Sequence, residues 1–248
     1  FVTGVVPAIS SAVRKLTTPG EKVLIQTPVY PIFFNSILNN GRFVVENKLS
    51  YDKDKHEYSI DWDDLVTKLR DPQVSLMIFC NPQNPSGNIW DKDTLIRIGE
   101  LCKKNNVRVI SDEIHCDIVA PGMEYVPFAS ASQTNREISV TLVAPTKTFN
   151  IAGLQTAAMV IPDPDLRHKM WRSVNTDEVG EGGGECRARC DYHACRVGYR
   201  LFGVCAVNKA DSVYLNVIFR EKVAVGDFLP LAGGTMTGAI ESKNIALQ

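Results

Sequence analysis

A lysine that directly follows an apolar stretch is the residue of this chain best suited to covalent chemistry. The stretch 141–144 consists of β-branched and apolar residues, Pro145 interrupts it, and Lys147 comes soon after. A residue just past the end of a strand lies at the carboxyl edge of a sheet, where open α/β sheets bind their ligands. Because its usual pKa is about 10.4, such an amine attacks carbonyl groups only when burial or a neighbouring cation lowers that pKa. The alternative is a solvated surface lysine, which is the commoner case.

Polar residues follow other apolar stretches in the same way. Thr3 and Gly4 end the first short stretch, Asn84 lies in the loop after another, and Asp112 and His115 follow a third. In a parallel sheet the carboxyl ends of the strands lie at one edge, so these groups and the lysine can converge on one ligand. Each also has an ordinary alternative: a relaxed turn at Gly4, a tight Asn-Pro connection, and a helix cap at Asp112.

Gly4 also precedes a predicted helix. Backbone N–H groups at the start of a helix have no partner within it, and they form a ready site for a phosphate group. The sequence therefore predicts that an amine, a carboxylate, an imidazole and an anion site share one edge of a sheet.

The elements that must position these residues alternate between strand and helix. Apolar runs bounded by turn residues predict strands over 22–26, 42–46, 74–80, 107–111, 138–143 and 155–161. Apolar residues at helical spacing predict helices over 5–16, 32–39, 61–69, 91–105 and 165–174. We therefore expect an α/β fold with a doubly wound, mostly parallel sheet and helices on both faces.

Composition limits the classes of function. The chain has 248 residues, 44% of them hydrophobic, which is enough for a buried core. A net charge of -1 gives no basic excess for nucleic acid, and no apolar run reaches the roughly 20 residues of a membrane helix. Cys80, Cys102 and Cys116 are scattered singly, as reduced thiols are. No export signal is visible, so we expect a cytoplasmic protein with no membrane or nucleic-acid partner.

Several stretches together resemble one known family. The chain is similar to the class I/II aminotransferases, which are fold type I pyridoxal-phosphate enzymes, and most closely to their carbon-sulfur β-lyase branch, the cystathionine β-lyase type. The stretches that carry the resemblance are TGVVPAIS, GEKVLIQTPVYPIF, IFCNPQNPSGNIW, VRVISDEIHCDIV, APTKTFNIAGLQT and SVNTDEVGE. They cover nearly all of residues 1–180 in family order. The resemblance implies that residues 1–180 are the large domain that binds pyridoxal 5'-phosphate.

The resemblance assigns roles around the cofactor ring. Lys147 corresponds to the lysine that forms a Schiff base with the cofactor, and Asp112 to the carboxylate that pairs with the pyridinium nitrogen. Asn84 and His115 correspond to the residues beside the phenolic oxygen, where many relatives have tyrosine in place of the histidine. Tyr30 corresponds to the aromatic ring that stacks on the pyridine face.

The resemblance also assigns the phosphate site. The backbone N–H groups of Gly4 and Val5 are expected at the phosphate, with the hydroxyls of Thr3 and Thr146 as further donors. Many relatives have an arginine or lysine eight positions after the Schiff-base lysine, where this chain has Gln155. We therefore expect the phosphate charge to be offset less fully here.

The reaction implied by the resemblance is β-elimination from an L-amino acid that carries sulfur on Cβ. The lysine removes the Cα proton, and the products are a thiol, pyruvate and ammonia. Transamination is the alternative, because the same residues serve both reactions.

Both ends of the chain depart from the family pattern. The chain begins inside a predicted strand and turn, so we expect earlier chain to be missing, together with the segment that closes the site and reaches the partner subunit of a homodimer. After residue 181 the resemblance stops. The arginine with which the family binds the substrate carboxylate has no counterpart in this chain. A catalytically inactive truncated chain is therefore a further alternative.

Residues 181–248 are not assigned to a domain. We interpret this segment as a frameshifted or fused piece of the original gene, with zinc binding as the alternative, although the spacing does not form a paired C-x2-C pattern. The residues that could act as zinc ligands are Cys186, Cys190, His193 and Cys195. The stretch 227–240 resembles a repeat of phage tail-fibre proteins, which form trimers, and this supports a composite chain.

Overall fold

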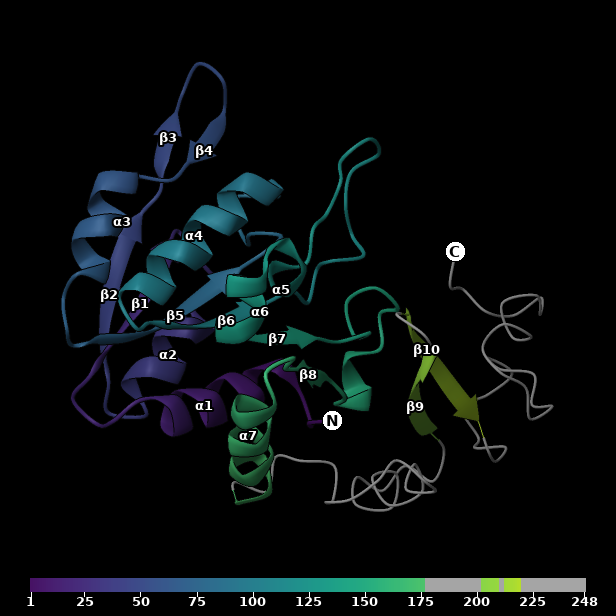
Figure 1. Ribbon diagram of the computed structural model, residues 1–248. Coiled ribbons are helices and arrows are strands. Elements are labelled where there is room, and N and C mark those ends of the chain that lie inside the picture. Colours follow the sequence, from purple (N-terminus) through teal and green to yellow (C-terminus); the bar gives the residue numbers. More distant parts are fainter. Residues whose placement is uncertain (177–201, 210–211, 220–248) are drawn as a thin grey trace.

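A six-stranded sheet with helices on both sides forms the main body of the molecule (Figure 1). The computed structural model of the chain describes residues 1–176, 202–209 and 212–219. The strand order is β2-β1-β5-β6-β7-β8, and neighbouring strands are parallel except for β7 and β8. The strands are β1 (Lys22–Thr27), β2 (Phe43–Lys48), β5 (Val74–Cys80), β6 (Arg108–Asp112), β7 (Ser139–Val143) and β8 (Ala158–Val160). This arrangement confirms the predicted fold class.

The helices cover the sheet in two groups. In Figure 1 one group lies below the sheet and the other above it. The first group is α1 (Val5–Leu16), α2 (Ile32–Leu38) and α7 (Pro164–Thr176). The second is α3 (Trp62–Leu69), α4 (Lys92–Lys104), α5 (Phe128–Ala131) and α6 (Gln133–Ile138).

Alternate residues of the central strands supply the two cores. In β5, Leu76 and Ile78 pack with the core on the α1 side, whereas Met77 and Phe79 pack with the core on the α4 side. All four side chains are almost fully buried. Successive side chains of a strand point to opposite faces, so a strand covered on both faces must be apolar throughout. This explains why β5 is apolar at every position except Ser75.

Aspartates fix where two helices of the second group begin. The Asp61 side chain accepts a hydrogen bond from the Asp64 N–H at 3.0 Å, and the Asp91 side chain accepts one from the Thr94 N–H at 2.7 Å. Such bonds satisfy backbone donors that have no partner inside the helix. The predicted start of a helix at Asp61 is confirmed.

The order of the strands creates a natural ligand site. From β1 the chain continues to β2 on one side, and it later crosses to β5 on the other side of β1. Ligands of open α/β sheets bind outside the carboxyl ends of the strands near such a reversal of direction. The loops after β1 and β5 flank this position.

Some local structure differs from the expectation. A short antiparallel hairpin, β3 (Ser50–Asp52) and β4 (Glu57–Ser59), lies between β2 and α3. The strand predicted to begin at residue 155 begins instead at Ala158 and runs antiparallel to β7. A 3₁₀ turn, η1 (Ala152–Leu154), precedes it, and Gln155 has a left-handed backbone with φ of 49°.

Beyond residue 176 the structure describes one hairpin, β9 (Phe202–Lys209) with β10 (Ser212–Phe219), which is antiparallel. The residues of the alternative zinc site and the stretch 227–240 lie outside the described residues. Among the described helices, none is both long enough and apolar enough to cross a membrane.

Candidate active site

A cavity of about 280 Å³ lies at the carboxyl ends of the parallel strands. This volume is close to the lower end of the range of roughly 300–1,000 Å³ that small-molecule sites occupy. Every residue that the sequence analysis predicted for the site lines it: Thr3, Gly4, Val5, Tyr30, Asn84, Asp112, His115, Thr146 and Lys147. The structure therefore brings together residues that are up to 144 positions apart in the sequence.

The strand ends that carry the site are held side by side by backbone hydrogen bonds. The Asn81 N–H donates to the Asp112 carbonyl at 3.0 Å, and the Glu113 N–H donates to the Leu142 carbonyl at 2.9 Å. These bonds continue the ladder just past β5 and β6. Asp112 is the last residue of β6, and the turn that carries Lys147 follows β7. The carboxylate and the amine thus enter the cavity from adjacent parallel strands.

The turn that carries Lys147 is closed by its own backbone and tied to the neighbouring loop. The Phe149 N–H donates to the Pro145 carbonyl at 2.9 Å. The Thr148 hydroxyl donates to the Asp117 carboxylate at 2.8 Å, which joins this turn to the loop after β6. The Lys147 side chain itself is exposed, so a substrate could reach it.

Asp112 is a buried carboxylate beside the cavity. Its side chain is 5% exposed, and among the described residues its carboxylate accepts one hydrogen bond, from the Ile114 N–H at 3.2 Å. The pKa of Asp112 is raised to about 7. Burial is the largest cause, the Ile114 bond acts in the opposite direction, and the negative charge of Glu113 adds to the increase. A buried carboxylate with so few donors gains most from a cation placed beside it. The site is therefore suited to a protonated ring nitrogen.

His115 is kept neutral by its surroundings. Burial lowers its pKa, and the positive charge of Lys147 lowers it further. A neutral imidazole has one nitrogen that donates a hydrogen bond and one that accepts. His115 can therefore donate to an oxygen of a ligand without adding charge to the site.

The start of α1 also lines the cavity. Gly4 precedes the helix, and among the described residues no side chain caps it and no acidic residue lies in its first turn. The chain just before it is fixed by paired backbone bonds between Val2 and Ala157, at 2.9 and 2.8 Å. A rigid, uncapped helix start presents N–H groups and a positive dipole end, which suit a phosphate.

Other residues that line the cavity were not predicted as site residues. Cys80 is the last residue of β5, and its thiol donates to the Pro82 carbonyl at 3.2 Å. Burial raises the pKa of this thiol, and the charge of Asp112 raises it further, so it remains protonated. Gln155 and Thr156 also line the cavity. The alternation of β5, which places Cys80 on the α1 side, was the signal that could have identified this thiol.

Comparisons with known proteins agree with this geometry. A sequence model described as aminotransferase class I and II matches residues 1–176. Cystathionine beta-lyase PatB of Bacillus subtilis (strain 168) is 48% identical over 180 residues, which are 73% of this chain and 46% of that protein. Cystalysin from Treponema denticola, whose crystal structure contains a pyridoxal 5'-phosphate cofactor, has a TM-score of 0.70 and 36% identity, covering 80% of this chain and 48% of that one.

A PLP-bound C-S lyase from Staphylococcus hominis is similar as well. It has a TM-score of 0.66 and 33% identity, covering 70% of this chain and 44% of that one. The chain therefore spans just under half the length of these relatives. The matched residues 1–176 contain the whole six-stranded sheet and every predicted residue of the cavity, and the chain belongs to the aminotransferase class I and II family.

Proposed function

We propose that this chain carries the cofactor site of a pyridoxal-phosphate-dependent carbon-sulfur β-lyase that acts on L-amino acids. The observation that carries the proposal is the cavity itself, in which Asp112 and Lys147 from adjacent strands meet the uncapped start of α1. The carboxylate, the amine and the anion site correspond to the pyridine nitrogen, the aldehyde and the phosphate of this cofactor.

Each part of the cavity has a role in holding the cofactor. Asp112 would keep the ring nitrogen protonated, and its own burial cost would be offset by that charge. The start of α1, at Gly4 and Val5, would bind the phosphate, with the hydroxyls of Thr3 and Thr146 nearby. Tyr30 would lie against the face of the ring, and Asn84 and His115 would lie at its oxygen.

The reaction would depend on a proton transfer by Lys147. When bound, pyridoxal phosphate supplies an electron sink that stabilises negative charge on the Cα of an amino acid. The Lys147 amine takes the Cα proton, and Asp112 keeps the opposite end of the site negatively charged. His115 donates a hydrogen bond while remaining uncharged. Overall, the Cβ–S bond is cleaved and water is added, which gives a thiol, pyruvate and ammonia.

The relatives support elimination as the reaction. PatB is named a cystathionine beta-lyase and the Staphylococcus hominis structure a C-S lyase, and the identities are 48% and 33%. Transamination is the second candidate, because the family that matches residues 1–176 is named for it. The cavity residues suit both reactions, so only the products distinguish them.

A direct experiment is to incubate the purified 248-residue chain with pyridoxal phosphate and L-cystathionine and to measure pyruvate and free thiol. We expect both to appear in equal amounts and to be lost in Lys147→Ala. Formation of an amino acid from an added keto acid, without pyruvate, would identify a transaminase instead. Cofactor binding without either product would mean that the 248-residue chain is inactive.

We propose residues 1–180 as the cofactor-binding large domain and a homodimer for the complete protein. Three described cysteines, Cys80, Cys102 and Cys116, are free thiols, which supports a reducing, cytoplasmic environment.

A further inference from the structure

A buried glutamine connects the two loops that contribute Tyr30 and Asn84 to the cavity. Gln83 is 3% exposed, and its side-chain amide reaches from the loop after β5 to the end of β1. Its Nε2 donates to the Pro28 carbonyl at 2.8 Å and lies 3.4 Å from the Gln26 carbonyl. The residue next to Gln83 is Asn84, and the acceptor Pro28 lies two positions before Tyr30.

The chemistry of this contact requires an amide. Two carbonyl oxygens face the same nitrogen, so the group between them must provide two N–H donors and no negative charge. A glutamine amide meets this requirement. A carboxylate at the same place would point its oxygens at the two carbonyls and push the loops apart.

Both ends of the connection are fixed. On one side, the Gln83 N–H donates to the Asn88 carbonyl and the Gly87 N–H donates to the Gln83 carbonyl, each at 2.8 Å. Gly87 has φ of 76°, a left-handed conformation that glycine adopts without strain. The loop that presents Asn84 is therefore closed on itself, and Gln83 is its anchor.

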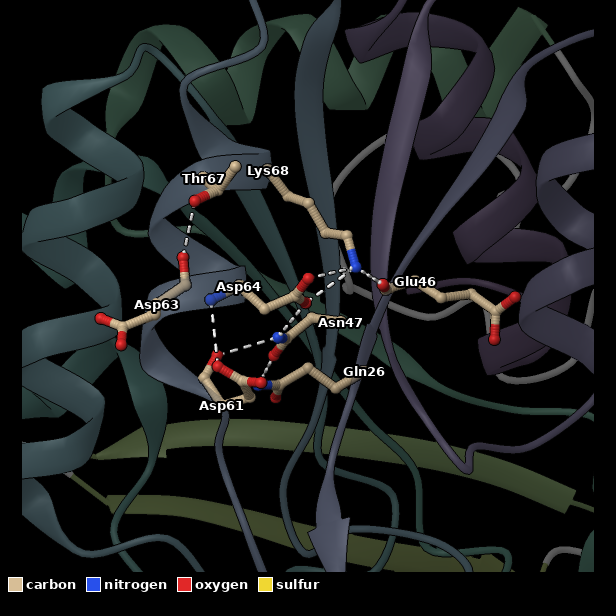
Figure 2. A network of polar contacts seen from close by, with 8 residues as sticks. All are labelled: Gln26, Glu46, Asn47, Asp61, Asp63, Asp64, Thr67 and Lys68. Atoms are coloured by element: carbon tan, nitrogen blue, oxygen red, sulfur yellow. Dashed lines mark hydrogen bonds and ion pairs between the residues drawn. The ribbon is translucent and has the colours of Figure 1, made fainter.

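On the other side, Gln26 belongs to a polar network that ties β1 and β2 to α3 (Figure 2). Gln26 Nε2 donates to Asn47 Oδ1 at 3.0 Å, and Asn47 Nδ2 donates to the Asp61 carbonyl at 3.0 Å and to Asp64 at 2.8 Å. Lys68 also donates to Asp64, at 2.7 Å. The carbonyl that Gln83 approaches thus belongs to a strand end that is itself held in place.

We propose that Gln83 is a positioning residue that sets the distance between Tyr30 and Asn84 across the cavity. The inference rests on the proposed cofactor site: Tyr30 lies at the ring face and Asn84 at the ring edge, so their separation determines how well a flat ring fits. Gln83 does not itself line the cavity and acts through these two residues. Loss of its amide would loosen the ring's surroundings and weaken cofactor binding.

The test is the dissociation constant of pyridoxal phosphate, measured by equilibrium dialysis on the full 248-residue chain. Gln83→Met, which keeps the length but removes both donors, should weaken binding by about tenfold. Gln83→Glu should weaken it further near neutral pH. At lower pH the introduced carboxyl group is protonated and can donate one hydrogen bond. The dissociation constant of Gln83→Glu should then be closer to that of the unaltered chain. Gln133→Met, at an exposed glutamine of α6, is the matched control and should not change binding. A cooperative unfolding transition of each variant, measured without cofactor, shows that the variant is folded.

A double-mutant cycle separates positioning from a general loss of structure. In a Tyr30→Ala, Asn84→Ala background, Gln83→Met should weaken binding by less than about threefold, because its effect passes through those residues. An unchanged tenfold penalty in that background, or no penalty in the original one, would overturn the inference. If the unaltered chain binds no pyridoxal phosphate at all, the proposed function fails and this inference with it. If it binds normally and Gln83→Met binds equally well, only the inference fails.

Discussion

Asp112 and Lys147 enter one cavity from the carboxyl ends of adjacent parallel strands, β6 and β7. The register pairs Asp112 with Leu142, so the carboxylate lies level with the residue five positions before the lysine. Because these strands are parallel, both groups lie at the carboxyl edge of the sheet. The behaviour of the site should therefore follow from the charges of these two residues and of their immediate neighbours.

The burial of Asp112 should make the cofactor-free protein less stable as pH rises. Its pKa is about 7 in the folded chain, above the value of about 3.9 in an unfolded one. Because the folded pKa is the higher one, the contribution of Asp112 is fully present below about pH 4 and is lost as pH rises through about 7. Relative to Asp112→Asn, the unaltered chain should therefore lose a few kcal/mol of unfolding free energy across this range.

Urea unfolding at about pH 4.5 and about pH 8, without pyridoxal phosphate, measures this difference. Added cofactor should reverse it at the higher pH, because a cation beside Asp112 stabilises the ionised carboxylate. Parallel pH dependences for the two proteins would show that Asp112 is not held in a desolvated site.

His115 should titrate below the usual histidine range of about 6.5. Lys147→Met removes the positive charge that disfavours the imidazolium, so the pKa of His115 should rise in that variant. Proton NMR titration of the histidine ring signals measures it, and His115→Asn identifies the signal. An unchanged pKa in Lys147→Met would mean that the amine does not approach the imidazole.

Glu113 should be important for stability although it does not line the cavity. Its side chain is 1% exposed and accepts hydrogen bonds from the Ser111 hydroxyl at 2.7 Å, from the Phe128 N–H at 2.9 Å, and from the Tyr125 hydroxyl. Burial raises its pKa, and these donors counteract the effect. Glu113→Ala would leave several buried donors without an acceptor, which should cost about 3 kcal/mol of unfolding free energy.

The control for this variant is Glu137→Ala. Glu137 is exposed and forms an ion pair with Lys103 at 3.1 Å, and exposed pairs of this kind contribute little to stability. Denaturant midpoints of both variants are the measurement. Equal, small shifts would contradict the assignment of Glu113 as the anchor of the loop between β6 and α5.

The sequence predicted the central helices and strands well where turn residues mark their ends. The helix over 5–16 and the strand over 74–80 are confirmed residue by residue, because a proline, glycine or asparagine lies within three residues of each end. The hairpin of β3 and β4 is mostly exposed, so no apolar alternation marked it. The antiparallel direction of β8 depends on the 3₁₀ turn before it, which has no periodic pattern.

The residues of the site were predictable for a different reason. Thr3, Gly4, Asn84, Asp112, His115 and Lys147 follow apolar runs, so the topology of a parallel sheet predicts that they meet at one edge. Val5, Tyr30 and Thr146 were predicted only from the resemblance to the family. The hydrogen-bond partners of Cys80 and Gln83 could not be predicted in this way. They depend on which carbonyl groups approach these side chains, and only the folded chain determines that.

Chemical trapping can identify whether Lys147 is the amine that reacts with pyridoxal phosphate. The chain is incubated with the cofactor, reduced with borohydride and digested, and the peptide that retains the cofactor is identified by mass spectrometry. We expect the label on Lys147, with no labelled peptide in Lys147→Ala. A label on another lysine, or equal labelling of Lys147→Ala, would contradict the assignment of this cavity as the cofactor site.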